Sequence, residues 1–574
     1  MKTLADRIAV ATKKVPADLV LKGGYVVNVF SHEVIEADVA ICGEFIAAVG
    51  PGYVGEATLE LSGKFVAPGL MDAHIHMESS MLHPRLLAST LLKCGTTSII
   101  ADPHEIANVA GLRGIDFMMA ETRDLPFDVF FMAPSCVPAS DLETSGAVLG
   151  REQLKELAQN PRILGLAEVM NYPGVVAGLP GLMEKIEVFR DKIIDGHCPG
   201  LSAEGLQAYV AAGMRSDHEC TTRPEVLEKL RAGMMVMIRE GTLAKNLEDL
   251  APLINRETAQ RFCLISDDLH PQDILQKGHL NYILRKAVSL GIDPVLAIEL
   301  VTINPANFFR LYDRGAVAPG YRADLVVFND LDGFEVTEVI KNGRLVVREG
   351  EGSDELRLGT LSCPESLRIM SCGPVSPDGF SIPCKGKNKA RVIELIDGQI
   401  VTRATIEEIE GREGQLEPDT KRDVLKIAVI ERHRGSGKIG LGLVHGFGLK
   451  RGAIASSVAH DSHNIVTVGA KDADMAAAVN EVIKMGGGLV VADGGSAVER
   501  LALPIAGLMT AEPLENVVRA LDSLCKGARE TLGCGLEDPF MPLSFLALPV
   551  IPELRVTDMG VVDVNQFKTV PLLM

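Results

Sequence analysis

Eight short apolar runs recur between residue 65 and about residue 305, and each is followed by enough residues for a helix. Strands that alternate with helices form βαβ units with a parallel sheet, and eight units over about 240 residues match a (β/α)8 barrel. The sequence therefore predicts an α/β fold with a TIM-like barrel. The runs are FVAPGLMDAHI (65–75), TTSIIADPH (96–104), FDVFFMAP (127–134), ILGLAEVM (163–170), IIDGH (193–197), MRSDH (214–218), GMMVMIRE (233–240) and RFCLISDD (261–268).

Two similar β-rich segments flank these runs, and a different pattern follows. Residues 17–50 and 323–351 both open with Ala-Asp-Leu-Val, so we expect a small composite β-sandwich built from both sides of the barrel. Beyond residue 365, strand-like runs, a helix near 472–485 and glycine-rich turns predict an additional α/β domain. The predicted domain boundaries are 1–64 and 311–364 for the two parts of the β-sandwich, 65–310 for the barrel and 365–574 for the C-terminal domain.

Composition argues against several classes of protein. A net charge of −19 and the lack of a Lys/Arg cluster disfavour nucleic acid or an anionic membrane as a partner. The first residues contain no signal-peptide core and no window is apolar enough to span a membrane, so we expect a cytoplasmic location. The 11 cysteines include no C-x-x-C pair, which indicates reduced thiols. A small neutral or cationic ligand fits this chain better.

Polar residues at the carboxyl ends of the strands form the active site of such a barrel, whatever the reaction. His74 and His76 end the first run, and they share a face because strand side chains alternate. A lone histidine or acid at a strand end is more often a cap or a hydrogen-bonded polar group than a ligand. Six of them at one mouth nevertheless favour a site for divalent transition metals. The six are His74, His76, Glu168, His197, His218 and Asp267.

The order His-x-His, acid, His, His, Asp resembles that of the amidohydrolase superfamily, whose barrel carries a small composite β domain. Within that superfamily, PGLMDAHIHMESS, IADPHEIANV, LAEVMNYPGV, DGHCPGL, SDHE and ISDDLHP are similar to motifs of the bacterial adenine deaminase family. The resemblance runs over the full length, because that family also has an extra C-terminal domain.

The resemblance implies a binuclear metal centre. Many superfamily members bridge the two metals with a carboxylated lysine, but the LAEVM run contains no lysine and a glutamate takes its place. The family is associated with manganese or iron, and the ligand types also permit zinc. On this basis His74, His76 and Asp267 would hold the first metal, His197 and His218 the second, and Glu168 would bridge them.

The implied reaction is hydrolysis of adenine to hypoxanthine and ammonia, a purine-salvage step, by attack of a metal-bridging hydroxide on C6. Asp267 would accept the proton of the hydroxide and return it to the leaving amine. A ring nitrogen must also be protonated or strongly hydrogen-bonded, and Glu219 is the candidate; an outward-facing loop carboxylate is an equally good interpretation. Weaker candidates for reading the purine edge or supporting the metals are Asp102, His104, Glu105 and Arg239, and for Arg239 a structural ion pair is the simpler interpretation.

Two other functions stay open. A cyclic-amide or amide hydrolase of the same superfamily is weakened by the missing lysine, and a non-catalytic binding barrel is weakened by the six intact ligands. A deaminase of the cytidine deaminase type is excluded because H-x-E with P-C-x-x-C is absent. We also expect a homo-oligomer. In the C-terminal domain, His460 and His463 are interpreted as turn residues that hydrogen-bond locally, in preference to metal ligands.

Overall fold

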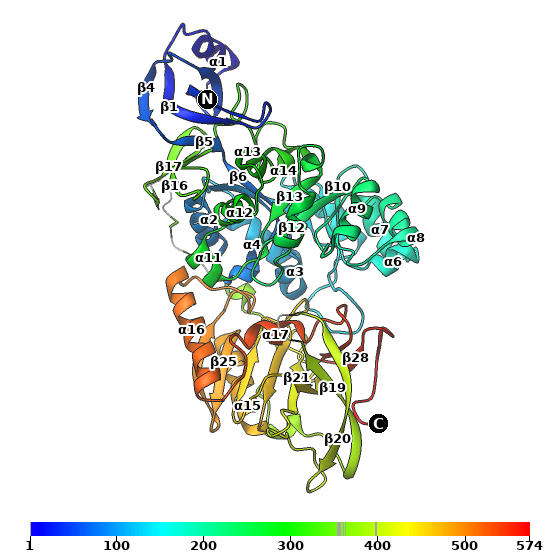
Figure 1. The fold of residues 1–574 in the computed structure, drawn as a ribbon. Helices are drawn as coiled ribbons and strands as arrows, with labels where there is room; N and C mark the ends of the chain where they lie inside the picture. Colours follow the sequence, from blue (N-terminus) through cyan, green and yellow to red (C-terminus); the bar gives the residue numbers. More distant parts are fainter. Residues whose placement is uncertain (1, 353–357, 360, 362, 397–398) are drawn as a thin grey trace.

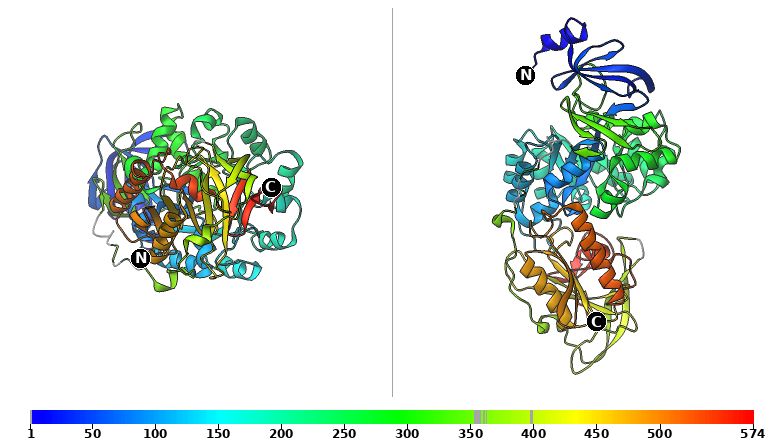
Figure 2. Two further views of the ribbon diagram at one scale, coloured as in Figure 1. Left: turned by 90° about the horizontal axis from the view of Figure 1, so that it is seen from below. Right: turned by 90° about the vertical axis from the view of Figure 1, so that its left-hand side faces the viewer.

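The protein consists of three parts that follow one another along one direction (Figure 1). The computed structural model describes residues 2–352, 358–359, 361, 363–396 and 399–574. The small β domain holds the N-terminus at one end, the barrel lies in the middle, and the C-terminal domain forms the other end. The side view in Figure 2 shows the same order. Within the described part of the chain, no helix combines the length and the apolar character needed to cross a membrane.

The small β domain is built from both sides of the barrel. Its sheet has the order β18-β17-β16-β15-β5-β1-β2-β3, with β4 paired to β1, so strand β5 joins the two halves by pairing with β1 and β15. Helix α1 (Leu4–Ala11) packs against β3 and β2. The strands are β1 (Ala17–Asn28), β2 (Glu33–Cys42), β3 (Phe45–Gly50), β4 (Gly55–Glu60), β5 (Phe65–Pro68), β15 (Leu325–Phe328), β16 (Val336–Lys341), β17 (Arg344–Arg348) and β18 (Glu351–Gly352).

Each of the eight predicted runs contains a strand of the parallel barrel, so the fold class is confirmed. The first run differs in detail, because it divides at Gly69 into β5 of the small domain and β6 of the barrel. A Cβ at Gly69 would lie 2.4 Å from Thr97 Oγ1, so only glycine lets the chain pass so close to β7. The barrel strands are β6 (Leu70–His76), β7 (Thr96–Ala101), β8 (Asp128–Ala133), β9 (Ile163–Val169), β10 (Ile193–Gly196), β11 (Ser216–Asp217), β12 (Met235–Arg239), β13 (Phe262–Ile265) and the short β14 (Asp267–Asp268).

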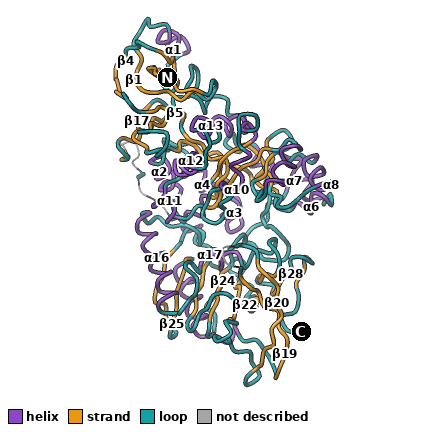
Figure 3. The backbone as a smooth tube through the Cα atoms, viewed as in Figure 1, coloured by secondary structure: helices purple, strands orange, loops and turns teal. Residues whose placement is uncertain are grey.

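Two hydrogen-bonded sheets close into the barrel. One has the order β10-β9-β8-β7-β6-β14 and the other β11-β12-β13. Strand β14 follows β13 after one residue and pairs with β6, while Arg215 N donates to Ile194 O (3.0 Å) at the other junction. Figure 3 shows strands in the middle part of the molecule with helices around them. These are α2 (Pro84–Lys93), α3 (His104–Ala110), α4 (Leu112–Glu121), α5 (Arg151–Ala158), α6 (Tyr172–Val176), α7 (Pro180–Val188), α8 (Ala203–Ala211), α9 (Arg223–Arg231), α10 (Leu247–Leu250), α11 (Pro271–Lys277), α12 (Leu280–Ser289), α13 (Pro294–Glu299) and α14 (Ile303–Phe308).

The C-terminal domain is a mixed α/β unit. Its main sheet has the order β20-β19-β22-β21-β24-β23-β25-β26, and α15 packs on the last four of these strands. The strands are β19 (Gly386–Leu395), β20 (Thr402–Gly411), β21 (Leu425–Ile430), β22 (Ile439–His445), β23 (Ala453–Ser456), β24 (Ile465–Gly469), β25 (Gly488–Asp493), β26 (Ser496–Ala502) and, in a second sheet, β27 (Leu554–Thr557), β28 (Gly560–Asp563) and β29 (Lys568–Thr569). The helices are α15 (Asp472–Met485), α16 (Leu514–Glu530) and α17 (Phe540–Phe545).

The C-terminal domain docks on the end of the barrel where the parallel strands finish. The turn after β6 pairs with it, since His83 N donates to Thr510 O (2.8 Å) and Thr510 N donates to Met81 O (2.9 Å). The loop after β8 is held as well: Thr144 N and Oγ1 donate to the Asp558 carboxylate at 2.9 and 2.6 Å. Loops at this end of a barrel form the active site, so the C-terminal domain covers the mouth where the six predicted ligands end their strands.

Candidate metal centre

The six predicted ligands lie together at the mouth of the barrel. His74 and His76 end β6, Glu168 lies near the end of β9, and Asp267 opens β14. His197 and His218 each follow directly after a strand, β10 and β11 respectively. His197 is partly buried and the other five are buried, so the interaction among these residues is little screened by water.

Glu168 lies between two pairs of histidines. Its Oε2 is 2.6 Å from His197 Nδ1 and 3.2 Å from His218 Nε2. Its Oε1 faces the other pair, at 3.4 Å from His76 Nε2 and 4.0 Å from His74 Nε2. A carboxylate with one oxygen toward each pair has the arrangement that a bridging ligand requires.

Asp267 completes the group on the side of His74 and His76. Its Oδ1 lies 3.2 Å from His76 Nε2 and 3.5 Å from His74 Nε2. The residue has a positive φ of 59°, a conformation that aspartate tolerates better than most residues. Asp267 lies where the chain leaves β13, which pairs with β12, and enters β14, which pairs with β6.

Neighbouring groups fix which nitrogen of each β6 histidine faces the centre. His74 Nδ1 lies 3.0 Å from Asp195 Oδ2, and His76 Nδ1 lies 3.3 Å from the carbonyl oxygen of Asp102. Both partners are acceptors, so Nδ1 carries the proton and the Nε2 lone pair is free. Metal-binding histidines commonly have this support. Asp195 was not predicted, although it lies two residues before His197 in the same run.

The spacing of the nitrogen atoms fits metal coordination. Two nitrogens that each lie about 2.1 Å from one ion are themselves about 3.0–3.4 Å apart. The Nε2 atoms of His74 and His76 are 3.2 Å apart, and so are His197 Nδ1 and His218 Nε2. Each histidine pair can therefore share one ion without rearrangement.

The electrostatics of the centre favour positive charge at the ligand nitrogens. Burial opposes protonation of His76, but Asp267 and Asp268 outweigh it and raise the pKa to about 10. Burial likewise opposes protonation of His197, and Glu219 and Glu168 raise its pKa to about 9. Burial would raise the pKa of Glu168, yet His197 and His218 hold it well below its ordinary value. The field that attracts protons here also attracts divalent cations.

Comparison with known proteins agrees with this geometry. Residues 65–346 match the model of the amidohydrolase family, and residues 399–568 match the adenine deaminase C-terminal domain. A protein named adenine deaminase from Desulfatibacillum aliphaticivorans is 50% identical over 98% of this chain and 99% of its own length. A second, adenine deaminase 2 from Carboxydothermus hydrogenoformans, is 47% identical over the whole of both chains.

The chain belongs to the adenine deaminase family. Proteins with that name from Methanothrix thermoacetophila and other organisms match it over the same length, the former at 46% identity and 100% coverage of both chains. The amidohydrolase model spans the barrel and the later half of the small β domain. Membership of this family does not favour the cyclic-amide hydrolase or the non-catalytic barrel.

In this member of the adenine deaminase family, Glu219 and Arg239 form an ion pair beside the centre. Arg239 Nη1 and Nη2 donate to the two carboxylate oxygens of Glu219, the second contact at 3.1 Å. Arg239 Nη1 also donates to Asp267 Oδ2 (3.3 Å). Burial opposes the charge of Arg239, but Glu219 and Asp267 raise its pKa above the ordinary value. Arg239 thus links the predicted proton shuttle to the predicted purine-binding carboxylate.

The residues after β7 divide between the centre and the C-terminal domain. Asp102 Oδ1 accepts a hydrogen bond from His104 N (3.1 Å), which orders the start of α3. His104 Nδ1 lies 3.6 Å from Glu168 Oε1, at the edge of the centre. Glu105 points the other way and has Oε1 3.4 Å from His460 Nδ1 in the C-terminal domain.

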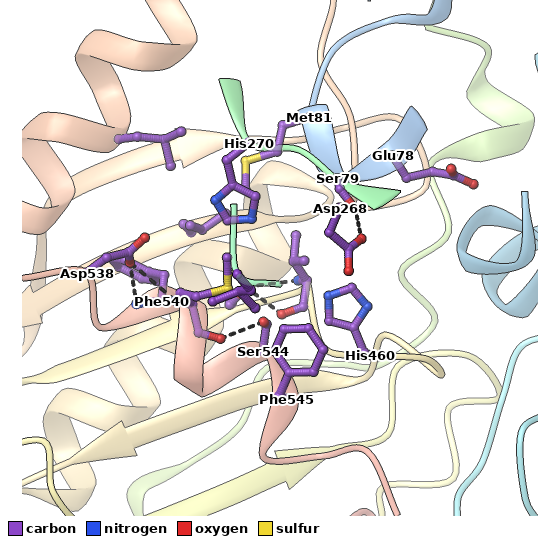
Figure 4. A pocket seen from close by; sticks show the side chains of 16 residues that line it. Glu78, Ser79, Met81, Asp268, His270, His460, Asp538, Phe540, Ser544 and Phe545 are labelled. Carbon is purple, nitrogen blue, oxygen red and sulfur yellow. Dashed lines mark hydrogen bonds between the residues drawn. The ribbon is translucent and has the colours of Figure 1, made fainter. Parts of the chain in front are cut away.

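The C-terminal domain thus reaches the barrel mouth with residues that the sequence did not single out for this role. His463 does hydrogen-bond locally, since Ala459 N donates to its Nδ1 (3.1 Å). His460 extends further: it stacks on Phe545 with ring centroids 4.4 Å apart and lines a pocket opposite Ser79 and Asp268 (Figure 4). Ser79 Oγ donates to Asp268 Oδ1 (2.5 Å) on the barrel side of that pocket. Docking of the C-terminal domain adds His460 and Phe545 to the lining.

Proposed function

We propose that this chain hydrolyses adenine to hypoxanthine and ammonia at the mouth of its barrel. The observation that carries the proposal is the position of Glu168, between two histidine pairs, in a chain 50% identical over nearly its whole length to an adenine deaminase. A single carboxylate that serves two pairs suits a binuclear hydrolytic centre. Adenine carries no charge to conflict with the acidic surroundings of this mouth.

We propose a binuclear centre, with Mn²⁺ or Fe²⁺ favoured by the resemblance and Zn²⁺ permitted by the ligand types. Bound ions would supply a water acidic enough to lose its proton near neutral pH and positive charge to stabilise the transition state. Glu168 would bridge the ions. His74, His76 and Asp267 would hold one ion, and His197 and His218 the other.

Asp267 is the proposed proton shuttle. Burial opposes its ionisation, but His74 and His76 hold its pKa well below the ordinary value, so it is a carboxylate at neutral pH. Oδ1 is the oxygen nearest the two histidines, and Oδ2, which also accepts a long hydrogen bond from Arg239 Nη1 (3.3 Å), has a second lone pair to take the proton of the hydrolytic water. Return of that proton to the amino group at C6 makes ammonia a good leaving group.

Glu219 and Arg239 are proposed to orient the purine ring. The Glu219 carboxylate, held by Arg239, is proposed to accept a hydrogen bond from a ring N–H. Arg239 Nε is buried and donates no hydrogen bond within the described residues. This arrangement stabilises charge on the ring as C6 becomes tetrahedral.

The test is ammonia release from adenine, adenosine, guanine and hydantoin by purified protein of known metal content. We expect rapid release from adenine and little or none from adenosine, because the resemblance is to enzymes of the free base. Equal rates on adenine and adenosine would contradict the free-base specificity. Turnover of hydantoin without turnover of adenine would replace the proposal with a cyclic-amide hydrolase.

A further inference from the structure

A second group of metal-binding side chains lies between the barrel and the C-terminal domain. His104 begins α3, Cys136 lies in the loop after β8, and Asp461 lies in the loop between β23 and β24. One nitrogen, one sulfur and one oxygen of these residues all lie within 4.8 Å of one another, and all three residues are buried. The distance from His104 Nε2 to Asp461 Oδ1 is 3.8 Å. None of the three is among the six residues of the proposed catalytic centre.

We propose that His104, Cys136 and Asp461 bind a divalent ion of the zinc type, which ties the C-terminal domain to the barrel. The ion is additional to those of the proposed catalytic centre, and the proposal does not depend on the reaction. Two ligands come from barrel loops and the third from the C-terminal domain. The ion would therefore cross-link the barrel and the C-terminal domain at their interface.

The orientation of His104 suits this role. Its Nδ1 lies 3.1 Å from Asp102 Oδ2 and 3.6 Å from Glu168 Oε1, so two carboxylate oxygens flank that nitrogen. Nδ1 makes no hydrogen bond within the described residues, but two acceptor oxygens on its side of the ring favour a proton there, which leaves the lone pair on Nε2, the atom toward Asp461. A histidine whose other nitrogen faces a carboxylate is the usual form of a metal-binding histidine.

The Asp461 carboxylate is only partly satisfied: Oδ1 lies 3.8 Å from His104 Nε2, the nitrogen proposed to share the ion. Asp461 is 2% exposed, and its Oδ2 accepts no hydrogen bond in the part of the chain that the structure describes. Glu143 is buried as well. The positive charge of Lys185 is engaged by a backbone group, since its ammonium donates to Ser135 O (2.8 Å). Buried carboxylates without a counter-charge are costly, and a cation would remove that cost.

The ligand loops are held in place by other contacts. Asn108 Nδ2 donates to the carbonyl oxygens of both His104 (3.0 Å) and Cys136 (3.2 Å). Asn464 Nδ2 donates to Thr144 O (2.8 Å), which fixes the loop of Asp461 on the barrel. The three ligands are thus positioned from both domains, as a preformed site requires.

The ligand types favour zinc over the ions proposed for the catalytic centre. Zn²⁺ takes thiolate, imidazole and carboxylate in tetrahedral sites. Cys136 would lose its thiol proton to solvent on binding, and the thiolate and the Asp461 carboxylate would then balance the charge of the ion. No cysteine is among the six residues of the catalytic centre, so a bond from metal to sulfur distinguishes the two sites.

A neighbouring group with similar residues does not meet the same requirement. Glu105, His460 and His463 also bring potential ligand atoms together. Ala459 N, however, donates to His463 Nδ1 (3.1 Å), which places the proton of the neutral ring on Nε2. That is the atom toward Glu105, at 3.9 Å from Oε2. A protonated nitrogen has no lone pair for a metal, so we do not extend the proposal to this group.

Cobalt substitution tests the proposal by its spectrum. Metal-free full-length protein is titrated with Co²⁺, and the near-ultraviolet absorption of a thiolate-to-cobalt charge transfer is recorded. We expect this band in the unmodified protein and in Cys263→Ser, which alters an equally buried barrel thiol. We expect it to be lost in Cys136→Ser. Absence of the band from the unmodified protein, or its persistence in Cys136→Ser, would overturn the proposal.

Metal analysis of Asp461→Asn gives an independent result if Cys136→Ser fails to fold. After reconstitution with Zn²⁺, we expect the asparagine variant to hold one equivalent fewer than the unmodified protein. His218→Ala should instead lose an equivalent while keeping the cobalt–thiolate band, because its ligand belongs to the catalytic centre. Unchanged zinc content in Asp461→Asn contradicts the proposal. The cobalt band and the zinc content do not depend on adenine. They therefore test the proposed zinc site even if the protein does not deaminate adenine.

Discussion

The barrel and the C-terminal domain bring polar side chains to the same interface by different means. In the barrel, every βα unit ends its strand at the same edge. Residues far apart in sequence, such as His74 and Asp267, therefore meet there. In the C-terminal domain, the residues concerned lie on one short loop, 459–464, between β23 and β24. Their position at the mouth depends on how that domain docks, through contacts such as Thr144 with Asp558.

The barrel mouth and the domain interface are therefore sensitive to different substitutions. Loss of a proposed barrel ligand should act at the centre itself, because each of these residues lies in or directly next to a barrel strand, and His74 also has a local partner in Asp195. Loss of a docking contact acts on the relative position of two domains and leaves the six barrel ligands in place. Variants of the first kind should change metal content or rate, and variants of the second kind should change the interface.

The largest effect is expected for Glu168→Gln. Glutamine keeps the shape but is neutral, and its amide group presents N–H donors to one of the two histidine pairs. We expect loss of both catalytic metal equivalents and a fall of adenine deamination to background, measured by metal analysis and ammonia release. Glu152→Gln on the exposed face of α5 is the matched control. Full metal content in Glu168→Gln would remove this residue from the bridge.

Asp267→Asn comes next and separates binding from proton transfer. Asparagine keeps one ligating oxygen but accepts no proton at neutral pH, and general acid–base catalysis contributes about 10²- to 10⁴-fold. We expect a variant that retains most of its metal and turns adenine over at least about a hundredfold more slowly. Rate and metal content are to be measured on the same sample. A fully loaded variant with the unmodified rate would shift the role to Glu219 or to a group near His104.

A smaller effect is expected for Asp195→Asn. The Asp195 carboxylate lies against His74 Nδ1, and partners of this kind typically contribute 10- to 100-fold to metal affinity or activity. We expect a loss within about that range, seen as easier removal of metal by a chelator. Asp191→Asn, an exposed carboxylate just before β10, should behave like the unmodified protein. An effect as large as that of Glu168→Gln would mean that Asp195 supports the whole centre.

The difference between the barrel and the docked C-terminal domain also explains which features could be predicted from the sequence. The eight strand runs and the grouping of the six proposed ligands followed from periodicity and from the rule that strand ends meet, and no long-range contact had to be known. The division of the first run at Gly69 was missed, because residues 65–75 are apolar on both sides of it and only the close approach to Thr97 separates β5 from β6.

The supporting residues were harder to predict for a physical reason. Asp195 precedes His197 within a predicted strand, so the alternation of side chains placed both on one face and gave a signal that could have been used. His460 and Asp461 carry no comparable signal, because a turn rich in His, Asp, Ser and Asn looks the same whether it faces solvent or another domain. Burial by docking decides their role, and docking is not local information.

The smallest effect, and the one that bears only on docking, is expected for Asp558→Asn. Both donors of Thr144 bond to this buried carboxylate, and hydrogen bonds to charged groups contribute about 1.5–3 kcal/mol each. Asparagine keeps one acceptor, so we expect the interface to weaken by about 1–3 kcal/mol, with amide exchange in residues 140–146 roughly five- to a hundredfold faster. Asp563→Asn, which bonds locally to Gln566 N, is the control on the same hairpin. Because no catalytic ligand moves, the content of catalytic metal should stay the same; loss of those ions from Asp558→Asn would show that docking also holds the barrel ligands in place.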